Sequence, residues 1–441
     1  MGLFVDIPKP KAWPPPPPED TKRVTELLEY GAKRDPIGDK FHVAFACLFM
    51  FALPIDTYPT TIATWILFIY SVLRLPSTWR TITPIYNSTI FRFAFAWAAW
   101  SLLSIIWSSN QAAGLDHAGA LRMVLLPVVL WPVMRQWKYL LMAFLVGVLL
   151  QNLAQITEFV WSWFSSEQAI SHSLTGIEKH SGKAALFMGF ASLAWLCILV
   201  VGTTRKKVVT ICFLLATAGM FATVSMAVYV GYVCAIAAIG IIALVHRKIR
   251  LRQGLILVAV VFCVAAASWL AAGDSMVSKT RSAVQGVSSF CKGDLQANNS
   301  TILRLHWWSK TLDEYANNST QCIFGHGMGS VSSIDFSTNG TALNKRADHI
   351  HNSYIQILYG EGIIGLTLFI GFLITLSKGA LLLSKRYGWM IGATCLGGVV
   401  LWSAATFFEN SHSSGRPFAM VILLGTLIMY FQANNSRTAQ S

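Results

Sequence analysis

Charged residues are scarce in this sequence. Asp, Glu, Lys and Arg together make up 12% of its 441 residues, whereas hydrophobic residues make up 54%. In average soluble proteins about a quarter of the residues are charged, so a set of soluble domains is excluded and a polytopic membrane protein is favoured. The net charge of +14 is divided among short connectors between apolar runs. We therefore predict no nucleic-acid partner and a surface in contact with membrane lipids.

Signatures of cofactors and metals are also lacking. No Walker motif is present, and the Gly-His-Gly-Met-Gly segment at 325–329 lacks the strand before it and the helix after it that a nucleotide-binding loop needs. No Cys-x-x-Cys pair or Cys/His set has the spacing of a zinc site, and no acidic cluster suggests another metal. We predict no cofactor and no metal ion.

Cysteines are few, and most lie inside apolar runs, where they are expected to pack as small buried residues. Cys291 and Cys322 instead share the one large polar loop. In an oxidising compartment they can form a disulfide that closes about thirty residues, provided that their Cα atoms lie within about 7 Å. We predict this disulfide.

Apolar runs dominate the chain and predict an all-α polytopic membrane protein with about 12 transmembrane helices. A Pro-rich tail at 1–40 precedes nine helices within 41–272, and the large loop at 273–360 separates these from three helices within 361–433 and a tail at 434–441. The runs are 41–56, 59–74, 89–108, 118–134, 137–161, 183–202, 207–224, 226–245, 253–272, 361–383, 388–408 and 416–433.

Lys and Arg lie in alternate connectors, on the same side as the basic N-terminal tail. Because basic connectors stay in the cytoplasm, both termini are predicted to be cytoplasmic. The loops near 109–117, 162–182, 273–360 and 409–415 are then outside. No cleavable signal peptide is apparent, and the first apolar run is expected to remain as a signal-anchor.

The stretch from Asp348 to Gly365 joins the polar loop to the next apolar run. From His351 to Tyr359 the apolar residues recur with the spacing of one helix face, and Gly360 and Gly362 are expected to break that helix. The pattern predicts a half-helix at the membrane interface with His351 at its exposed start. An isolated histidine at such a place would more often have no chemical role.

Positive charges on the predicted outer side oppose the orientation rule and need an explanation. Each could reach the interface or pair with a carboxylate, and for Lys279 and Arg281 we favour that explanation. As a group they predict a cationic cavity for a lipid-linked phosphate or diphosphate. Its candidate residues are Arg122, Lys179, His180, Lys183, Lys279, Arg281 and Arg304.

A polar stripe runs along the predicted helix at 137–161. Gln151, Gln155 and Glu158 stand at i, i+4 and i+7, with Asn152 beside them. Polar groups inside a membrane usually face the bundle interior or a wet cavity. Binding of sugar hydroxyls and hydrogen bonding to a neighbouring helix are equally compatible with the stripe.

The segment around 300–366 resembles the bacterial O-antigen ligases, which share a superfamily with the O-antigen polymerases. The family pattern is His followed by Asn, Ser or Gln, nine residues, Gly, two residues, then Gly, Thr or Tyr. An Arg followed by Trp and a glycine-rich turn commonly precedes it. The matching residues are Arg304, Trp307, Trp308, Gly325, Gly327, Gly329, His351, Asn352, Gly362 and Gly365.

The resemblance implies a GT-C-like glycosyltransferase of the bacterial inner membrane, with its active site facing the periplasm. It would transfer O-antigen from undecaprenyl diphosphate to the lipid A-core, in one inverting step without a metal. His351 and Arg304 would be catalytic. His349 and Asn352 beside His351 are added to the predicted substrate-binding residues, and Asp348 is a candidate to orient the histidine.

One departure from the family concerns a short outer turn, where members usually carry a Ser-Arg pair. This chain has Ser225-Met226, and methionine cannot bind phosphate. Either another cation replaces the arginine, with Arg122 and Arg281 as the candidates, or the site is changed in this chain.

Three alternatives remain at this point. An O-antigen polymerase or a protein O-oligosaccharyltransferase would use the same donor, and a 12-span transporter has a similar helix count. Carriers built from repeats usually show matching halves, whereas here a single large loop lies between the predicted ninth and tenth helices. The transporter is therefore the least favoured.

Overall fold

The computed structural model describes residues 24–164, 174–246, 266, 277–293, 299–317, 319–336, 347 and 349–435. No β-strand occurs in these ranges. The longer helices are α1 (Val24–Arg34), α2 (Pro36–Ala52), α3 (Thr57–Thr78), α5 (Thr89–Ser104), α6 (Gln111–Leu121), α8 (Trp137–Phe164), α9 (Ser181–Val201), α10 (Lys206–Ala222), α11 (Met226–Val245), α13 (Ser300–Ala316), α15 (Ser353–Arg386), α16 (Trp389–Phe408) and α17 (Gly415–Asn435). The shorter ones are η1 (Trp79–Ile82), α4 (Thr83–Tyr86), η2 (Ile105–Trp107), η3 (Arg122–Leu125), α7 (Leu126–Leu130), η4 (Trp131–Gln136), α14 (Ser319–Phe324) and η6 (Ser330–Ser333).

Among the described residues, eight helical segments are long and apolar enough to cross a membrane. The all-α polytopic prediction is confirmed, whereas the count of 12 remains a prediction. α2 and α10 have 17 residues each, a little short for a spanning helix. The predicted span at 253–272 lies outside the described residues, apart from residue 266. The eight segments are Thr57–Tyr86, Thr89–Trp107, Gln111–Trp161, Ser181–Val201, Met226–Val245, Ser353–Arg386, Trp389–Phe408 and Gly415–Asn434.

The predicted spans 118–134 and 137–161 are not two clean helices. They belong to one helical run, Gln111–Trp161, which is interrupted by the 3₁₀ segments η3 and η4. Pro127 stands at the start of α7 and Pro132 at the start of η4. Proline removes a backbone donor and clashes with the preceding turn, which explains the interruptions.

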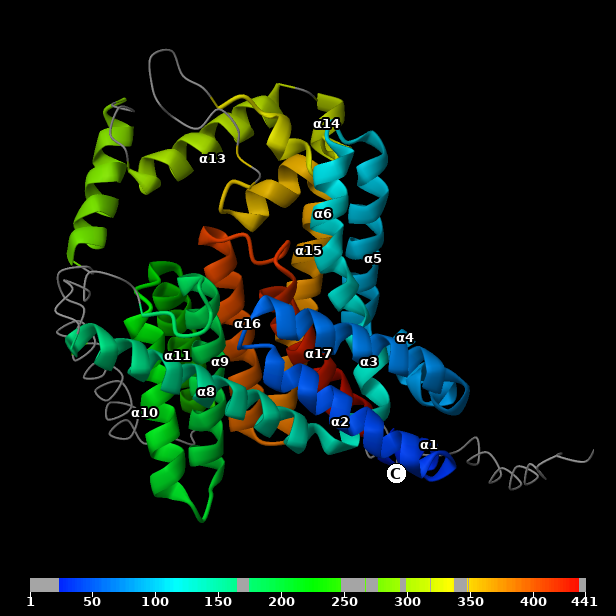
Figure 1. Cartoon of the computed structure of the whole chain (residues 1–441). Helices are drawn as coiled ribbons and strands as arrows, with labels where there is room; N and C mark the ends of the chain where they lie inside the picture. The colour runs from blue at the N-terminus through cyan, green and yellow to red at the C-terminus, as the bar shows by residue number, and fades with distance from the viewer. Residues whose placement is uncertain are drawn as a thin grey trace, which may run out of the picture.

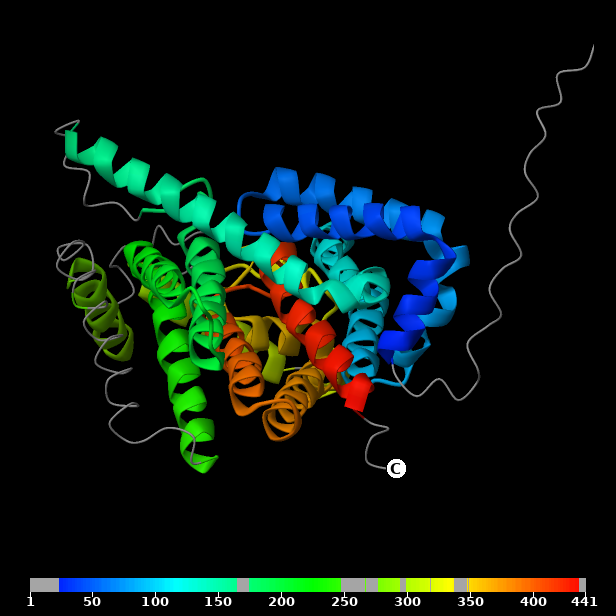
Figure 2. The ribbon, with the colours of Figure 1, turned by 90° about the horizontal axis from the view of Figure 1, so that it is seen from below.

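α15, α16 and α17 form the middle of the bundle. Seen from below, they lie between α2, α3 and α5 on one side and α9–α11 on the other (Figure 2). Four rings join the central helices: Trp97 packs on Phe369 and Phe418, and both of these contact Trp402. Such aromatic pairs contribute about 0.5–1.5 kcal/mol each beyond their buried area. This cluster therefore fixes α5 against α15, α16 and α17.

A lobe made of α13, α14 and η6 lies over one end of the bundle (Figure 1). It has a separate hydrophobic core that includes Trp307, Val331, Phe336, Ile350 and Tyr359. Asn299 caps α13, as the sequence predicts, by accepting a hydrogen bond from the Thr301 amide at 2.8 Å. All of these residues fall within the predicted loop at 273–360.

The predicted disulfide is not formed: Cys291 and Cys322 are both free thiols. Cys291 ends the helix over 277–291, and Cys322 lies in α14 at the opposite end of α13 (Figure 1). α13 has 17 residues and is therefore about 25 Å long, far beyond the reach of a disulfide. The thiol of Cys322 instead donates a hydrogen bond to the Tyr315 carbonyl at 3.4 Å.

Candidate functional site

His351 immediately precedes α15 and has a left-handed backbone, with φ of +53°. Such values are uncommon outside glycine, although histidine is among the residues that tolerate them. Asn352 begins the helix, because its Oδ1 accepts a hydrogen bond from the Ile355 amide at 3.1 Å. Asn352 is fully buried and serves as a helix cap, while its role as a substrate ligand stays a prediction. Non-glycine residues with a left-handed backbone, such as His351, are found preferentially at functional sites.

The predicted break in the helix is confirmed at Gly362, whose φ of 70° and ψ of −170° interrupt α15. The glycine-rich turn packs directly on this break. The amide of His326 donates to the Tyr359 carbonyl at 2.8 Å, and that of Gly327 donates to the Gly360 carbonyl at 2.7 Å. These two bonds satisfy carbonyl groups that the break leaves without helical partners.

Side chains are excluded from this junction. A Cβ on Gly325 would lie 2.3 Å from the Gly360 carbonyl oxygen, and one on Gly362 would lie 2.2 Å from the Ile323 carbonyl oxygen. Gly327 and Gly329 are equally crowded by the backbone at Ser108 and Gly114. The motif glycines thus join the lobe to the membrane helices and direct the first half of α15. Gly365 follows in the second half of α15, beside Glu361.

The indole of Trp307 supports the His351 ring. The two rings are stacked, with centroids 6.2 Å apart and planes 12° from parallel. His349 meets His351 edge-on at 4.6 Å, while Asp348 lies outside the described residues. Trp308 donates its indole hydrogen to the Ile350 carbonyl at 2.7 Å. The Trp-Trp pair of the sequence motif therefore fixes the segment that carries His351.

Glu409 connects the two predicted catalytic residues. Its carboxylate lies 3.3 Å from Nδ1 of His351 and 3.5 Å from the Arg304 guanidinium. Arg304 also donates to the Phe408 carbonyl at 3.2 Å. Burial raises the pKa of Glu409, but the hydrogen bond from His351 and the positive charge of Arg304 outweigh it and hold the pKa below its usual value.

The pairing with Glu409 sets the chemistry of the histidine. A carboxylate can only accept a hydrogen bond, so Nδ1 of His351 is the donor and Nε2 is left with a free lone pair. Sequence reasoning missed Glu409, which lies 58 residues from His351. One signal was present: Glu409 is the only acidic residue in the predicted outer loop at 409–415.

The first turn of α9 and the turn before α11 lie near the His351–Glu409 pair. A Cβ on Gly182 would lie 3.8 Å from both the Glu409 carboxyl carbon and the Ser225 hydroxyl. Lys183 is electrostatically coupled to Glu409 and to the buried Arg416–Glu178 ion pair. Two of the candidate elements, Lys183 and the Ser225–Met226 turn, are thus brought close to the His351–Glu409 pair.

A lysine reaches the turn that carries Met226, whereas the candidates Arg122 and Arg281 stay predictions. The Lys279 ammonium donates to the Val224 carbonyl at 3.5 Å, and partial burial lowers the pKa of Lys279. Val224 has φ of +52°, a genuine outlier for a β-branched residue. The expectation that Lys279 only reaches the interface or pairs with a carboxylate does not describe this contact.

Other predicted residues serve the fold. The side chains of Gln151 and Gln155 are buried and hydrogen-bond the backbone at Leu174, Thr175, Ile177 and Gly219. They therefore anchor the segment before α9, as the hydrogen-bonding alternative for the stripe expects, and their role in sugar binding stays a prediction. Lys179, His180 and Arg281 are exposed. Arg122 lies half-buried in η3.

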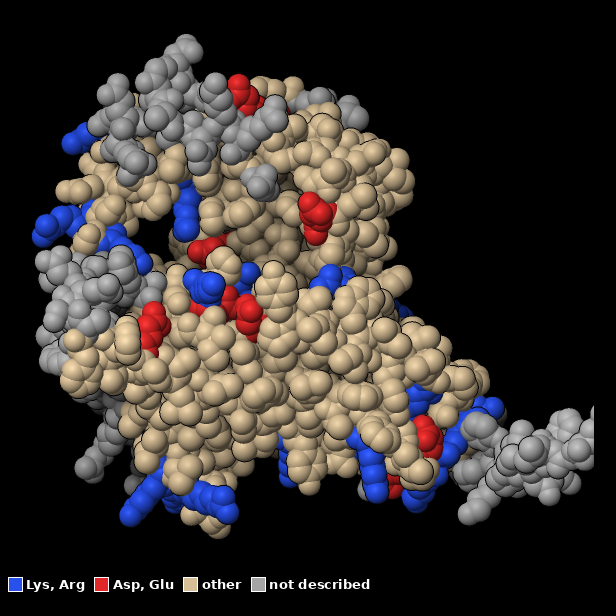
Figure 3. All heavy atoms as spheres, in the orientation of Figure 1, with Lys and Arg blue, Asp and Glu red and all other residues tan. Residues whose placement is uncertain are grey.

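Figure 3 shows Lys, Arg, Asp and Glu side chains around a hollow between the lobe and the membrane helices. Within the described ranges, no group of three or more His, Cys, Asp or Glu is arranged to hold a metal ion. The site thus offers a histidine with a free ring nitrogen, its carboxylate partner and several cations. Such a set can deprotonate a hydroxyl and stabilise a departing phosphate group.

Comparison with known proteins supports the same region. Residues 211–370 match a protein-family model described as O-Antigen ligase. No curated protein matches the chain.

Proposed function

The chain is a member of the O-antigen ligase/polymerase superfamily, and from this premise we propose that it is an O-antigen ligase. The proposed donor is O-antigen linked to undecaprenyl diphosphate, and the proposed acceptor is a sugar hydroxyl of the lipid A-core. The reaction would take place at the periplasmic face of the bacterial inner membrane, on the side where the lobe lies. Both termini would then be cytoplasmic.

The reaction forms one glycosidic bond and breaks another. The acceptor oxygen attacks the anomeric carbon, and its proton passes to Nε2 of His351. The bond between that carbon and the diphosphate oxygen breaks, and the diphosphate leaves with the electron pair. Because the nucleophile enters opposite the leaving group in a single step, the anomeric configuration is inverted.

Arg304 has the chemistry to bind the departing diphosphate. A guanidinium offers five N–H groups, and those not engaged by Glu409 and Phe408 remain for phosphate oxygens. We assign Lys183 and Lys279 to the same diphosphate, with Lys279 supplying the charge that Met226 lacks. A cation held before the reaction stabilises the developing negative charge without reorganisation.

One observation carries this proposal: His351 hydrogen-bonds through Nδ1 to Glu409, whose carboxylate also pairs with Arg304. The test is to incubate purified protein with lipid-linked O-antigen, with and without lipid A-core, and to separate the products. Transfer that requires the core is the expected result. Longer lipid-linked chains formed without core would show a polymerase instead, and no glycan product under either condition would refute both.

A further inference from the structure

The other end of the bundle contains a second polar feature, far from the lobe. A pocket of about 580 Å³ opens between α1, α2, η4 and the start of α8. The polar residues of its lining include Glu29, Lys33, Asp39, Lys40, Arg135 and Tyr139. Lys and Arg are concentrated along this lower edge (Figure 3), which the orientation rule assigns to the cytoplasm.

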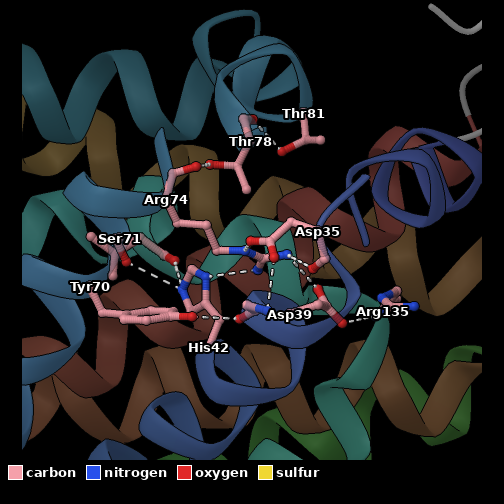
Figure 4. Close-up of polar contacts among 11 residues, drawn as sticks. Asp35, Asp39, His42, Tyr70, Ser71, Arg74, Thr78, Thr81 and Arg135 are labelled. Carbon is pink, nitrogen blue, oxygen red and sulfur yellow. Dashed lines mark hydrogen bonds and ion pairs between the residues drawn. The ribbon is translucent and has the colours of Figure 1, made fainter. Parts of the chain in front are cut away.

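An ion-pair network lies behind the pocket and shares Asp39 and Arg135 with its lining (Figure 4). Arg74 of α3 lies 3.0 Å from Asp35 and 3.2 Å from Asp39, and Asp39 also pairs with Arg135 of η4. His42 completes the network through Arg74 at 3.2 Å and the Val129 carbonyl at 2.9 Å. Two aspartates thus balance two arginines, so the network carries no net charge.

The charge left at the mouth of the pocket is positive. Lys33 and Lys40 are exposed, and only Glu29 opposes them, which leaves one excess positive charge. A phosphodiester carries one negative charge and can accept hydrogen bonds from the two exposed ammonium groups, so it matches the mouth of the pocket.

The surface beside the pocket is apolar. On α2, Phe41 and Leu48 are 54% and 44% exposed, and on α8 Tyr139 and Met142 are 63% and 45% exposed. α2 and α8 pack against each other, so these side chains lie on neighbouring helices of a membrane protein. Large apolar groups exposed in this way are in contact with lipid chains. A ligand with both a phosphate and acyl chains fits this combination better than a soluble phosphate.

We propose that this pocket binds the headgroup of an anionic glycerophospholipid from the adjacent leaflet. The phosphodiester contacts Lys33, Lys40 and Arg135, and the acyl chains lie along α2 and α8. The site is separate from the His351 region and does not depend on the proposed transferase activity. Its effect is to tie α1 and η4 to the membrane surface.

The test measures lipid binding to the purified full chain in detergent. Phosphatidylglycerol is titrated against the wild type and against the Lys33→Ala/Lys40→Ala variant, and bound lipid is counted by native mass spectrometry. Near a membrane surface each lysine contributes about a fivefold change in affinity, so the double variant is expected to bind about 25-fold more weakly. Lys206→Ala/Lys207→Ala is the matched control, because those two exposed lysines begin α10 and lie outside the pocket.

Two comparisons distinguish an anionic lipid from a neutral one, and a lipid headgroup from a free phosphate. Phosphatidylcholine, which has no net charge, is expected to bind at least tenfold more weakly than phosphatidylglycerol. Glycerol phosphate without acyl chains is expected not to compete at millimolar concentration. Equal loss of binding in the Lys206/Lys207 control, equal affinity for the two lipids, or full competition by glycerol phosphate would each overturn the proposal. The variant Lys33→Arg/Lys40→Arg keeps both charges and is expected to restore binding.

Discussion

Replacing Glu409 with glutamine tests the proposed role of the His351–Glu409 pair. The change keeps the shape of the side chain but removes the charge that accepts a hydrogen bond from Nδ1 of His351 and pairs with Arg304. A hydrogen bond to a charged group contributes about 1.5–3 kcal/mol, equivalent to about 10- to 100-fold in rate. Because the Glu409 side chain is 33% exposed, solvent screens part of this interaction. We therefore expect a loss of about tenfold in kcat.

The pH profile separates this role from a purely structural one. The pKa of Glu409 lies below its usual value, so the carboxylate is charged above the ordinary pKa of a glutamate. Its contribution to stability is present there and is lost only as the pH falls through the lowered folded-state value. In the variant this contribution is absent, so the difference in stability between the wild type and Glu409→Gln should vanish as the pH falls through that value.

The assay is transfer of lipid-linked glycan to lipid A-core by purified protein between pH 5 and 8. Glu314→Gln is the matched control, since Glu314 belongs to the same lobe and contacts Tyr359 but not His351. It is expected to keep the wild-type rate and profile. If Glu409→Gln also keeps both, Glu409 does not position the base and the reasoning fails.

Four further predictions follow from the same site and fold. His351→Ala should lower transfer by about 10²–10⁴-fold in protein that elutes as a single folded species, and a wild-type rate would remove His351 from the mechanism. Arg304→Lys should also transfer poorly, because an ammonium cannot bind phosphate at two points; activity equal to wild type would show that only charge matters. Gly325→Ala should lower the free energy of unfolding by about 1–3 kcal/mol or more, because Gly325 has a φ of +77° and a Cβ there would clash with Gly360. Gly240→Ala, at a position with open space around it, should leave the free energy of unfolding unchanged. An impermeant thiol reagent should modify a cysteine introduced near 335 and spare one near 250 in intact cells, and the reverse would invert the proposed topology.

Interactions between residues that are close in the sequence determine much of the site, and this part of the site could be predicted. The cap at Asn299 and the break at Gly362 depend on residue types that favour one local backbone conformation. Arg304, Trp307 and Trp308 stand at i, i+3 and i+4 of α13, so they share a helix face. The sequence could therefore predict that they meet a common partner, but not which one.

Contacts between distant elements were decided only by the packing of the helices. Glu409 reaches His351 because the end of α16 lies beside the start of α15, and Lys279 reaches Val224 across 55 residues. Gln151 and Gln155 have the same polar stripe whether they face a sugar or a loop, so the pattern could not distinguish the two. Cys291 and Cys322 are separated by the length of α13, which sequence separation does not reveal. Local conformation follows from local chemistry, whereas the partner of a side chain depends on the positions of whole helices.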